Sequence, residues 1–360
     1  MRYFYLKGLL FLSQLLGVSA WGKDGHEIVA NIAWNLLKHE TQQRVQTLLF
    51  PNGFNVTEHV SPLSSVATWA DKVRYTKYFA WTTPLHYVDV KDDLVDGGCH
   101  WTRGEQEFMR DIQSRKSGES IAVERRLESF SCNFDYERDC ENDFCAVGAI
   151  LDFWSQLETS NITDEDYGKS SLRGGKPSPI GQKYNVTTIQ SMKFLVHIVG
   201  DLHQPLHVSR ETDRGGNTIN VEFPEEFISF RDERFEDVMH NGWNLHSVWD
   251  DAIIQKSIKI NHDKSQYLMQ ESIEKELLTT DNVERWSSCH QDERKDCISE
   301  WAQESFRSAL EYAYVDEDGY EIKDGSSLSQ QYYQTRLNIV RHRLAAGGVR
   351  LAMILESLLG

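Results

Sequence analysis

Apolar residues recur at helical spacing along most of this chain. In residues 26–49, Ile28, Ile32 and Leu36 lie four apart, and Val29, Ala33 and Leu36 follow the i, i+4, i+7 pattern of one helix face. Patterns with the same period of about 3.6 residues lie at 64–75, 145–158, 188–203, 301–313 and 328–358. We therefore predict a mostly α-helical fold.

One stretch departs from this period. Between His207 and Trp243, the run RGGNTINVEF alternates Ile219, Val221 and Phe223 behind a Gly-Gly turn, as a hairpin strand does. We find no repeat and no linker, only polar loops, and 360 residues with 40% hydrophobic content can bury a large core. We predict one compact multi-helix domain over residues 21–360, all-α with a small β-hairpin excursion.

The first twenty residues have the composition of a signal peptide. Arg2 and Lys7 precede an apolar run at 8–18, and Val-Ser-Ala then ends at Ala20, which predicts cleavage before Trp21. A membrane anchor is the weaker reading, because spanning a bilayer takes about 20 apolar residues. We expect a secreted protein with no membrane anchor.

Export permits disulfides and glycosylation. Cys289 and Cys297 are close in sequence and far from the other cysteines, so we predict that they pair. The pairing of the remaining four stays open: Cys99, Cys132, Cys140 and Cys145. Three Asn-X-Thr sequons predict surface glycosylation in a eukaryotic host at Asn55, Asn161 and Asn185.

The formal charge of −17 at pH 7 gives no long-range attraction to a polyanion. A nucleic-acid substrate would therefore have to be held locally, and bound dications can supply that local positive field.

Two His/Asp pairs have helical spacing. In HIVGDLHQPLH, His197 and Asp201 lie four apart and share a helix face, whereas Pro205 interrupts the helix, so spacing cannot place His207. A single His/Asp pair at this spacing is at least as often a salt bridge or a helix cap as it is part of a metal site. In NLHSVWDD, His246 and Asp250 again lie four residues apart. Two pairs with the same residue types and spacing favour a common chemical role over two unrelated salt bridges.

Three further motifs carry the same residue types. Asp71 follows an apolar helix face in SSVATWADKVRY, His86 lies in TTPLHYVDV, and His26 lies in WGKDGHEIV, five residues after Trp21. Imidazole and carboxylate donors in these proportions suit zinc. We therefore predict a zinc centre.

Six motifs in one order now resemble a known family. WGKDGH, ADKVR, PLHYVD, HIVGDLHQPLH, the GGN turn and NLHSVWD are similar to motifs of the zinc-dependent nucleases of fungi and plants. That family cleaves single-stranded nucleic acids and 3'-nucleotides and shares a superfamily with the bacterial zinc phospholipases C. The resemblance covers residues 21–360 and implies a phospholipase C/nuclease-like helical fold with three zinc ions.

The resemblance also implies the ligands of each ion. One ion takes Asp71, His86, His197 and Asp201; a second takes the amine and carbonyl oxygen of Trp21, His26 and the shared Asp201; the third takes His207, His246 and Asp250. Asp201 is then catalytic as well, because the two ions that share it activate a water. His203 matches no ligand position, and we expect it to support or cap a neighbour.

Three more residues take implied roles beside the scissile phosphate. Arg74 binds phosphate through its fork of donors, Asp89 orients the attacking water, and Tyr87 stacks on a nucleobase. A structural ion pair is the alternative for both Arg74 and Asp89. Tyr87 also departs from the phenylalanine of the fungal members.

The function so implied is a secreted, zinc-dependent, monomeric endonuclease. It would hydrolyse single-stranded DNA and RNA to 5'-phosphorylated products and act on 3'-nucleotides. A secreted zinc phospholipase C is one alternative; Asp250, where those lipases are expected to carry glutamate, disfavours it, as do Tyr87 and Arg74. A non-catalytic secreted zinc-binding protein is the other, but a storage site needs neither Asp89 nor Arg74.

Overall fold

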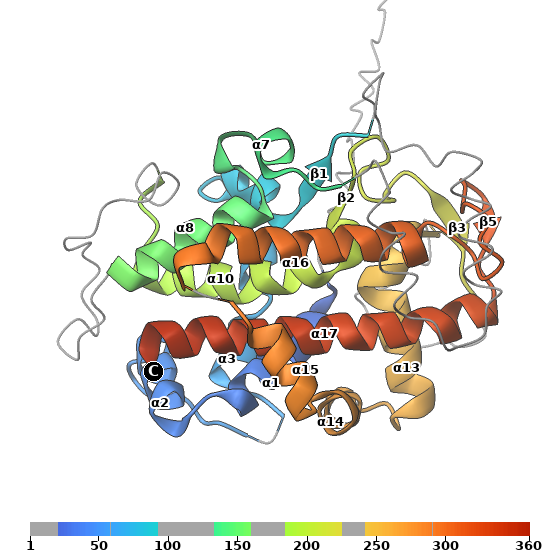
Figure 1. Cartoon of the computed structure of the whole chain (residues 1–360). Coiled ribbons are helices and arrows are strands. Elements are labelled where there is room, and N and C mark those ends of the chain that lie inside the picture. Colours follow the sequence, from blue (N-terminus) through green and yellow to red (C-terminus); the bar gives the residue numbers. More distant parts are fainter. Residues whose placement is uncertain (1–20, 58, 93–132, 160–183, 225–241, 290) are drawn as a thin grey trace, which may run out of the picture.

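The computed structural model describes residues 21–57, 59–92, 133–159, 184–224, 242–289 and 291–360 (Figure 1). Helices dominate these residues, as the sequence predicts. The helices up to residue 203 are α1 Lys23–Leu36, α2 His39–Leu49, α3 Pro62–Val66, α4 Trp69–Val73, α7 Tyr136–Asp139, α8 Ala146–Thr159 and α10 Thr188–His203. Those after it are α12 Leu245–Ser247, α13 Ile253–Asn261, α14 Gln266–Leu277, α15 Thr280–Ser287, α16 Arg294–Ser308 and α17 Gln330–Leu359.

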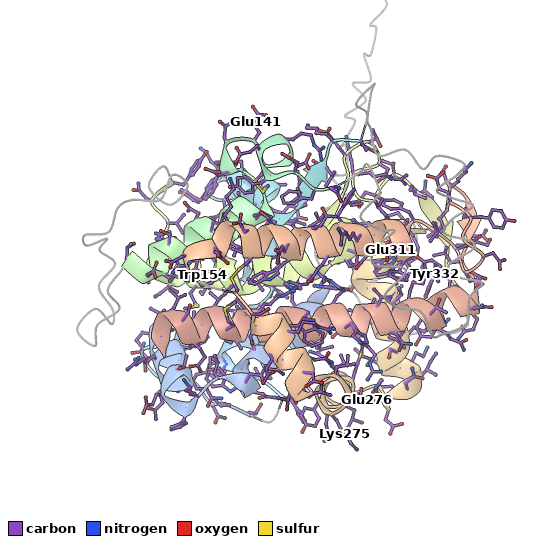
Figure 2. The ribbon with its side chains drawn as sticks, in the orientation of Figure 1. Glu141, Trp154, Lys275, Glu276, Glu311 and Tyr332 are labelled. Atoms are coloured by element: carbon purple, nitrogen blue, oxygen red, sulfur yellow. A yellow bond between two sulfur atoms is a disulfide. The ribbon has the colours of Figure 1, made fainter. Side chains whose placement is uncertain are left out.

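Two long helices organise the packing. Helix α17 runs along the molecule beneath α16 in Figure 1, and it packs against α1 and α10, while α10 also packs against α8 and α16. Gly348 allows the close approach of α17 to α1, because a Cβ there would lie 2.4 Å from the Ile32 side chain. Trp154 and Tyr332 are buried between the helices, whereas Glu141 and Lys275 project outward (Figure 2).

Helix α10 begins and ends where its sequence directs. At its start, the Thr187 hydroxyl accepts a hydrogen bond from the Gln190 amide, and the Gln190 side chain accepts one from the Thr187 amide. At its end, Gln204 turns to extended backbone (φ −81°, ψ 118°), as expected for the residue before Pro205. Because α10 is buried on nearly every side, its polar residues also lie in the interior.

The strands are short and frame the end of α10. Strand β1 (Val88–Val90) pairs in parallel with β2 (Val208–Arg210). Strand β3 (Asn220–Glu222) lies between β4 (Trp243–Asn244) and β5 (Ser326–Ser327). The strand predicted behind the Gly-Gly turn is therefore present.

The Gly-Gly turn itself does not join two paired strands; β3 pairs antiparallel with β4, the next strand in the described part of the chain. Gly215 and Gly216 have φ values of +63° and +80°, and they turn the chain against Leu206 and His246 rather than back along β2. A Cβ at Gly215 would lie 2.3 Å from the Leu206 carbonyl oxygen. The strand before the turn is therefore free to pair with β1.

Other predictions have mixed outcomes. Residues 26–49 form two helices, separated at Leu37. The pair Cys289–Cys297 is confirmed, and Cys140–Cys145 is a second disulfide.

Among the predicted glycosylation sites, Asn55 and Asn185 are exposed. The predicted signal peptide 1–20, Asn161, Cys99 and Cys132 lie outside the described residues. Among the described helices, none combines the length and the apolar character needed to cross a membrane.

Candidate metal centre

The structure brings the eight predicted histidine and aspartate ligands into the interior around the end of α10. His26 lies on α1, Asp71 on α4, His86 at the end of the 3-10 helix η1 (Ala80–His86), and His197 and Asp201 on α10. His207 ends the 3-10 helix η3 (Pro205–His207), His246 lies on α12, and Asp250 lies on the π-helix η6 (Val248–Ala252). Seven of the eight are buried, and Asp71 is partly exposed.

Asp201 lies between histidines from two different helices. Its Oδ2 is 2.9 Å from His86 Nδ1, and its Oδ1 is 3.1 Å from His26 Nε2. His197 Nε2, one turn earlier on α10, is 3.3 Å from Asp201 Oδ2. The two oxygens of one carboxylate therefore face opposite sides, the arrangement that lets an aspartate serve two ions.

Asp71 completes this first cluster from its partly exposed side. Its Oδ1 is 3.6 Å from His197 Nε2 and 3.8 Å from His86 Nδ1. The His26 ring stacks on the His197 ring, with ring centroids 3.9 Å apart. The five side chains thus converge on a small region.

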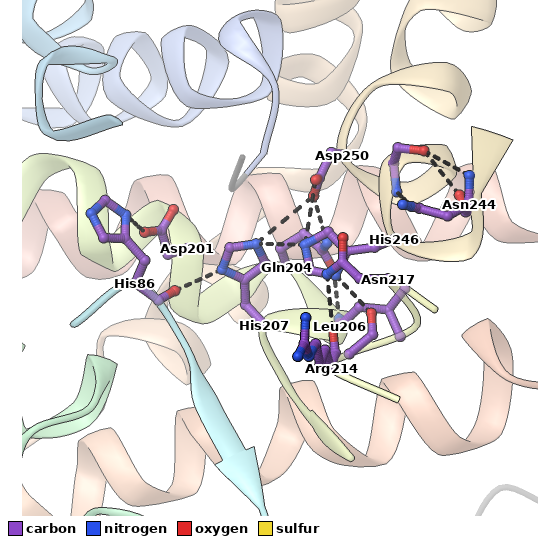
Figure 3. A network of polar contacts seen from close by, with 12 residues as sticks. His86, Asp201, Gln204, Leu206, His207, Arg214, Asn217, Asn244, His246 and Asp250 are labelled. Atoms are coloured by element: carbon purple, nitrogen blue, oxygen red, sulfur yellow. Dashed lines mark hydrogen bonds and ion pairs between the residues drawn. The ribbon is translucent and has the colours of Figure 1, made fainter. Parts of the chain in front are cut away.

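A second cluster lies beside the first (Figure 3). His207 Nε2 and His246 Nε2 are 3.1 Å apart. Asp250 Oδ2 is 3.4 Å from His246 Nε2, and Asp250 Oδ1 is 3.9 Å from His207 Nε2. A hydrogen bond joins the clusters, since His207 Nδ1 lies 2.7 Å from the backbone oxygen of His86.

The tautomers of these histidines show that a cation fits between them. His207 Nδ1 faces the His86 carbonyl oxygen and His246 Nδ1 faces the Gly215 carbonyl oxygen at 2.7 Å, so both Nδ1 atoms must donate. Both Nε2 atoms therefore carry lone pairs, which repel at 3.1 Å unless a cation lies between them. Metal-bound histidines usually donate their other N–H to a carbonyl in this way.

Burial keeps most of these rings in the form that binds metal. Desolvation lowers the pKa of His26 and His86 well below the ordinary value and that of His207 to about 3. Neutral imidazole is the metal ligand. Three groups of side chains could hold an ion: His26, Asp71 and His197; His86, His197 and Asp201; and His207, His246 and Asp250. The first group combines residues that the resemblance assigns to two ions.

Trp21 immediately precedes Gly22, whose backbone contacts one residue of each cluster, His26 and Asp250. It is fully buried and precedes the first turn of α1, which carries His26. The amide of Gly22 donates a 2.9 Å hydrogen bond to the Asp250 carbonyl oxygen. The predicted N-terminal ligand is thus bonded to a residue whose backbone contacts His26 and Asp250.

The Arg74 guanidinium has N–H donors that the described residues leave without a hydrogen-bond partner. It is buried, its Nη2 lies 3.5 Å from Asp71 Oδ1, and the same atom donates to the Tyr75 hydroxyl at 3.1 Å. In the described part of the chain, its Nε and Nη1 have no hydrogen-bond partner. Its charge partner is thus Asp71, and two N–H donors are available to a ligand.

Tyr87 directly follows His86, and Asp89 lies in β1 just after it. Both are partly buried. Burial, together with the Glu211 charge, raises the pKa of Asp89 to about 6. Among the described residues, no ion pair joins Asp89 to Arg74. The alternative of a structural ion pair therefore has support from contacts for Arg74, through Asp71, and none for Asp89.

His203 and Gln204 lie just past the ligands on α10. His203 belongs to none of the three groups, as expected: its Nδ1 faces the Val199 carbonyl oxygen and its Nε2 faces Arg350. Gln204 was not predicted, yet its Nε2 donates to Asp250 Oδ1 at 2.6 Å. Its place within HQPLH is the only sequence signal for it.

Fold and site together define a helical protein whose interior holds groups of histidine and aspartate that could bind metal ions. Residues 21–360 match the family model described as S1/P1 Nuclease. The chain is 31% identical to Endonuclease 1 of Arabidopsis thaliana, over 99% of this chain and 92% of that protein. It is 26% identical to Nuclease P1 of Penicillium citrinum (92% and 95% covered) and to Nuclease S1 of Aspergillus oryzae (96% and 94%).

This chain belongs to the S1/P1 nuclease family, whose members depend on metal. It is therefore a hydrolase that acts on phosphodiester bonds, and nucleic acid is its class of substrate.

Proposed function

We propose that this chain is a secreted, zinc-dependent endonuclease that prefers single-stranded DNA and RNA, releases 5'-phosphorylated products and also acts on 3'-nucleotides. The observation that carries the proposal is the pair of buried His/Asp clusters, in the second of which the imidazole lone pairs of His207 and His246 face one another. The enzyme is a monomer with one domain over residues 21–360, the range of the family match.

Three zinc ions are proposed, with ligands divided as follows. Asp71, His86, His197 and Asp201 hold one; the amine and carbonyl oxygen of Trp21, His26 and Asp201 hold the second; His207, His246 and Asp250 hold the third. The opposed contacts of the Asp201 oxygens support sharing. When bound, zinc supplies positive charge and Lewis acidity in an acidic protein.

Arg74 binds the scissile phosphate. Its partnerless Nε and Nη1 can donate to two phosphate oxygens, while Asp71 holds the guanidinium in place. An added charge-assisted donor at this point stabilises the negative charge that grows on the phosphoryl oxygens during attack.

Asp89 orients the attacking water by accepting a hydrogen bond from it. Attack on phosphorus breaks the bond to the 3'-oxygen, which leaves as a 3'-hydroxyl, and the other product carries a 5'-phosphate. Tyr87, two residues earlier, stacks on the neighbouring base. Stacking needs an exposed base face, which supports a preference for unpaired strands.

A substrate panel tests this function. Purified protein is assayed on denatured DNA, RNA, duplex DNA, 3'-AMP and phosphatidylcholine vesicles, each with and without chelator. We expect chelator-sensitive cleavage of the first two and of 3'-AMP, and much slower cleavage of duplex. Hydrolysis of phosphatidylcholine with nucleic acids left intact would instead favour a phospholipase C.

Secretion is supported by the apolar leader and the two disulfides. N-terminal sequencing of protein recovered from the medium of a eukaryotic host should begin at Trp21. Retention in the cell, or another start, would contradict both the secretion proposal and the N-terminal ligand.

A further inference from the structure

Gln204 is a buried polar residue with no role in the chemistry proposed above. It follows the last residue of α10 and its side chain is fully buried. Its Oε1 accepts the Leu206 amide at 2.5 Å, which fixes the orientation of the side-chain amide. Nε2 must then point the other way, where it donates to Asp250 Oδ1 at 2.6 Å (Figure 3).

The backbone of Gln204 contacts both clusters. Its amide donates to the Asp201 carbonyl oxygen, and its carbonyl oxygen accepts from the His207 amide, each at 3.0 Å. One residue therefore holds a proposed ligand of the first cluster by its backbone and two of the second by its backbone and side chain. Asp250 extends the link, since its carbonyl oxygen accepts from Gly22, next to Trp21.

We propose that Gln204 is a positioning residue that fixes the Asp250 carboxylate for its metal ion and couples the geometry of the two clusters. With Oδ1 held by Gln204, Oδ2 is left on the side of His246 Nε2, 3.4 Å away. The inference rests on the proposed function only in taking His207, His246 and Asp250 as ligands. Groups that orient a metal ligand typically contribute about 10–100-fold to metal affinity.

The surroundings explain why this position requires glutamine. The Leu206 amide needs an acceptor and the Asp250 carboxylate needs a donor, and only a side-chain amide of this length offers both. Methionine would fill the volume and leave both neighbours unpaired. Glutamate would keep the acceptor and place a second carboxylate against Asp250.

A matched control exists elsewhere in the core. Gln156 on α8 is also buried, its Nε2 donates to the Val186 carbonyl oxygen at 2.7 Å, and its Oε1 accepts from Ser191 Oγ at 2.7 Å. Neither of these partners, Val186 and Ser191, is a proposed ligand. Gln156→Met therefore repeats the loss of two buried hydrogen bonds away from the metal centre.

The experiment titrates zinc chloride into the chelator-stripped protein beginning at Trp21, against a competing chromophoric chelator. We expect Gln204→Met to weaken the weakest-bound ion by about 10–100-fold relative to the wild type, and Gln204→Glu by at least as much. Gln156→Met should lower the Tm but leave zinc affinity unchanged. Circular dichroism confirms that each variant is folded before titration.

Equal zinc affinity in Gln204→Met, Gln204→Glu and Gln156→Met would overturn the inference. So would a failure of both Gln204 variants to fold when Gln156→Met folds, since Gln204 would then serve the fold itself. The titration needs no substrate. If the Gln204 variants lose zinc affinity as expected but the zinc-loaded wild type cuts no nucleic acid, the proposed function alone is contradicted.

Discussion

Helix α10 carries two fully buried histidines with opposite surroundings. His197 faces the metal centre, whereas His203, six residues later, faces α16 and α17. Around His203 every contact joins a donor to an acceptor: its Nδ1 faces the Val199 carbonyl oxygen at 2.7 Å and its Nε2 accepts from Arg350 at 2.9 Å. Burial, with the nearby Arg343 charge, keeps the pKa of His203 well below its usual value.

The same comparison holds for the charged neighbours. Glu304 Oε2 forms ion pairs with Arg343 Nη1 at 2.8 Å and with Arg350 Nη1 at 2.7 Å. A protein carboxylate therefore balances the charge of the two arginines beside His203. Around His197, in contrast, Nε2 lies 3.1 Å from His86 Nδ1 and 3.3 Å from Asp201 Oδ2. Burial lowers the pKa of His197, but the charges of Asp201 and Asp71 outweigh burial and raise that pKa to about 9. A buried histidine is thus structural where each donor meets an acceptor, whereas the carboxylates gathered around His197 support its proposed role as a metal ligand.

The largest test of this contrast is Asp201→Asn. The amide keeps the shape but loses the charge that two ions share, so we expect zinc content to fall below three per chain. Turnover on denatured DNA should fall by about 10³-fold or more, because the stabilisation that bound metal provides amounts to several kcal/mol. Elemental analysis and initial rates measure both. Three retained ions with normal turnover would refute the shared-ligand assignment.

A second test extends the N-terminus. A chain that begins Met-Ala-Trp21 converts the Trp21 amine to an amide, which keeps its proton, whereas a free amine has a pKa of ~7.7 and yields it at little cost. We expect about two zinc ions per chain and loss of most activity. Proteolytic removal of the two residues should restore both. Full zinc content at the mature rate in the extended chain would exclude the N-terminal ligand.

Asp89→Asn separates chemistry from metal binding. Zinc content should be unchanged, while kcat falls by about 10²–10⁴-fold, because an amide orients the attacking water poorly. The wild type should lose kcat/KM as pH falls through about 6, where Asp89 gains its proton, and the variant should lack that limb. Zinc is measured at each pH as the control. A fall in thermal stability with normal turnover would make Asp89 structural.

Helical spacing could predict part of this centre. His197 and Asp201 lie four apart on a regular helix, so periodicity alone brings their side chains together, as the 3.3 Å contact confirms. His246 and Asp250 also meet, at 3.4 Å, although the chain between them enters the π-helix η6. π-Helical turns occur often at functional sites, and no residue pattern in this sequence predicted one here.

The other features of the candidate metal centre depend on contacts between segments that are distant in sequence. The Gly215 carbonyl that sets the His246 tautomer comes from the Gly-Gly turn, 31 residues away in sequence, and Gln204 meets Asp250 across 46 residues of sequence. Strands of three residues such as β1 and β2 have too little periodicity to be recognised, yet their pairing fixes Asp89 opposite Ser209. Such features follow from packing rather than from local pattern.

The smallest effect on the metal centre is expected from Glu304→Gln, which removes the carboxylate that balances Arg343 and Arg350 beside His203. Burial raises the pKa of Glu304, but the hydrogen bonds and charges of Arg350 and Arg343 outweigh it and hold that pKa below its usual value. A carboxylate with a depressed folded pKa stabilises the protein above the unfolded pKa, ~4.3. That stabilisation is lost as pH falls toward the folded pKa.

The Glu304 side chain is 45% exposed, so solvent screening keeps the loss at neutral pH near 1–2 kcal/mol, below the 3–5 kcal/mol of a fully buried pair. Denaturant unfolding at pH 7 and at pH 3.5 should show the difference from wild type shrinking at the lower pH. Zinc content and turnover of the folded protein should be unchanged, because Glu304 contacts the arginines beside His203 and no proposed ligand. Loss of zinc in this variant would show that the two histidines of α10 are energetically coupled, and the division between a structural and a ligand histidine would then fail.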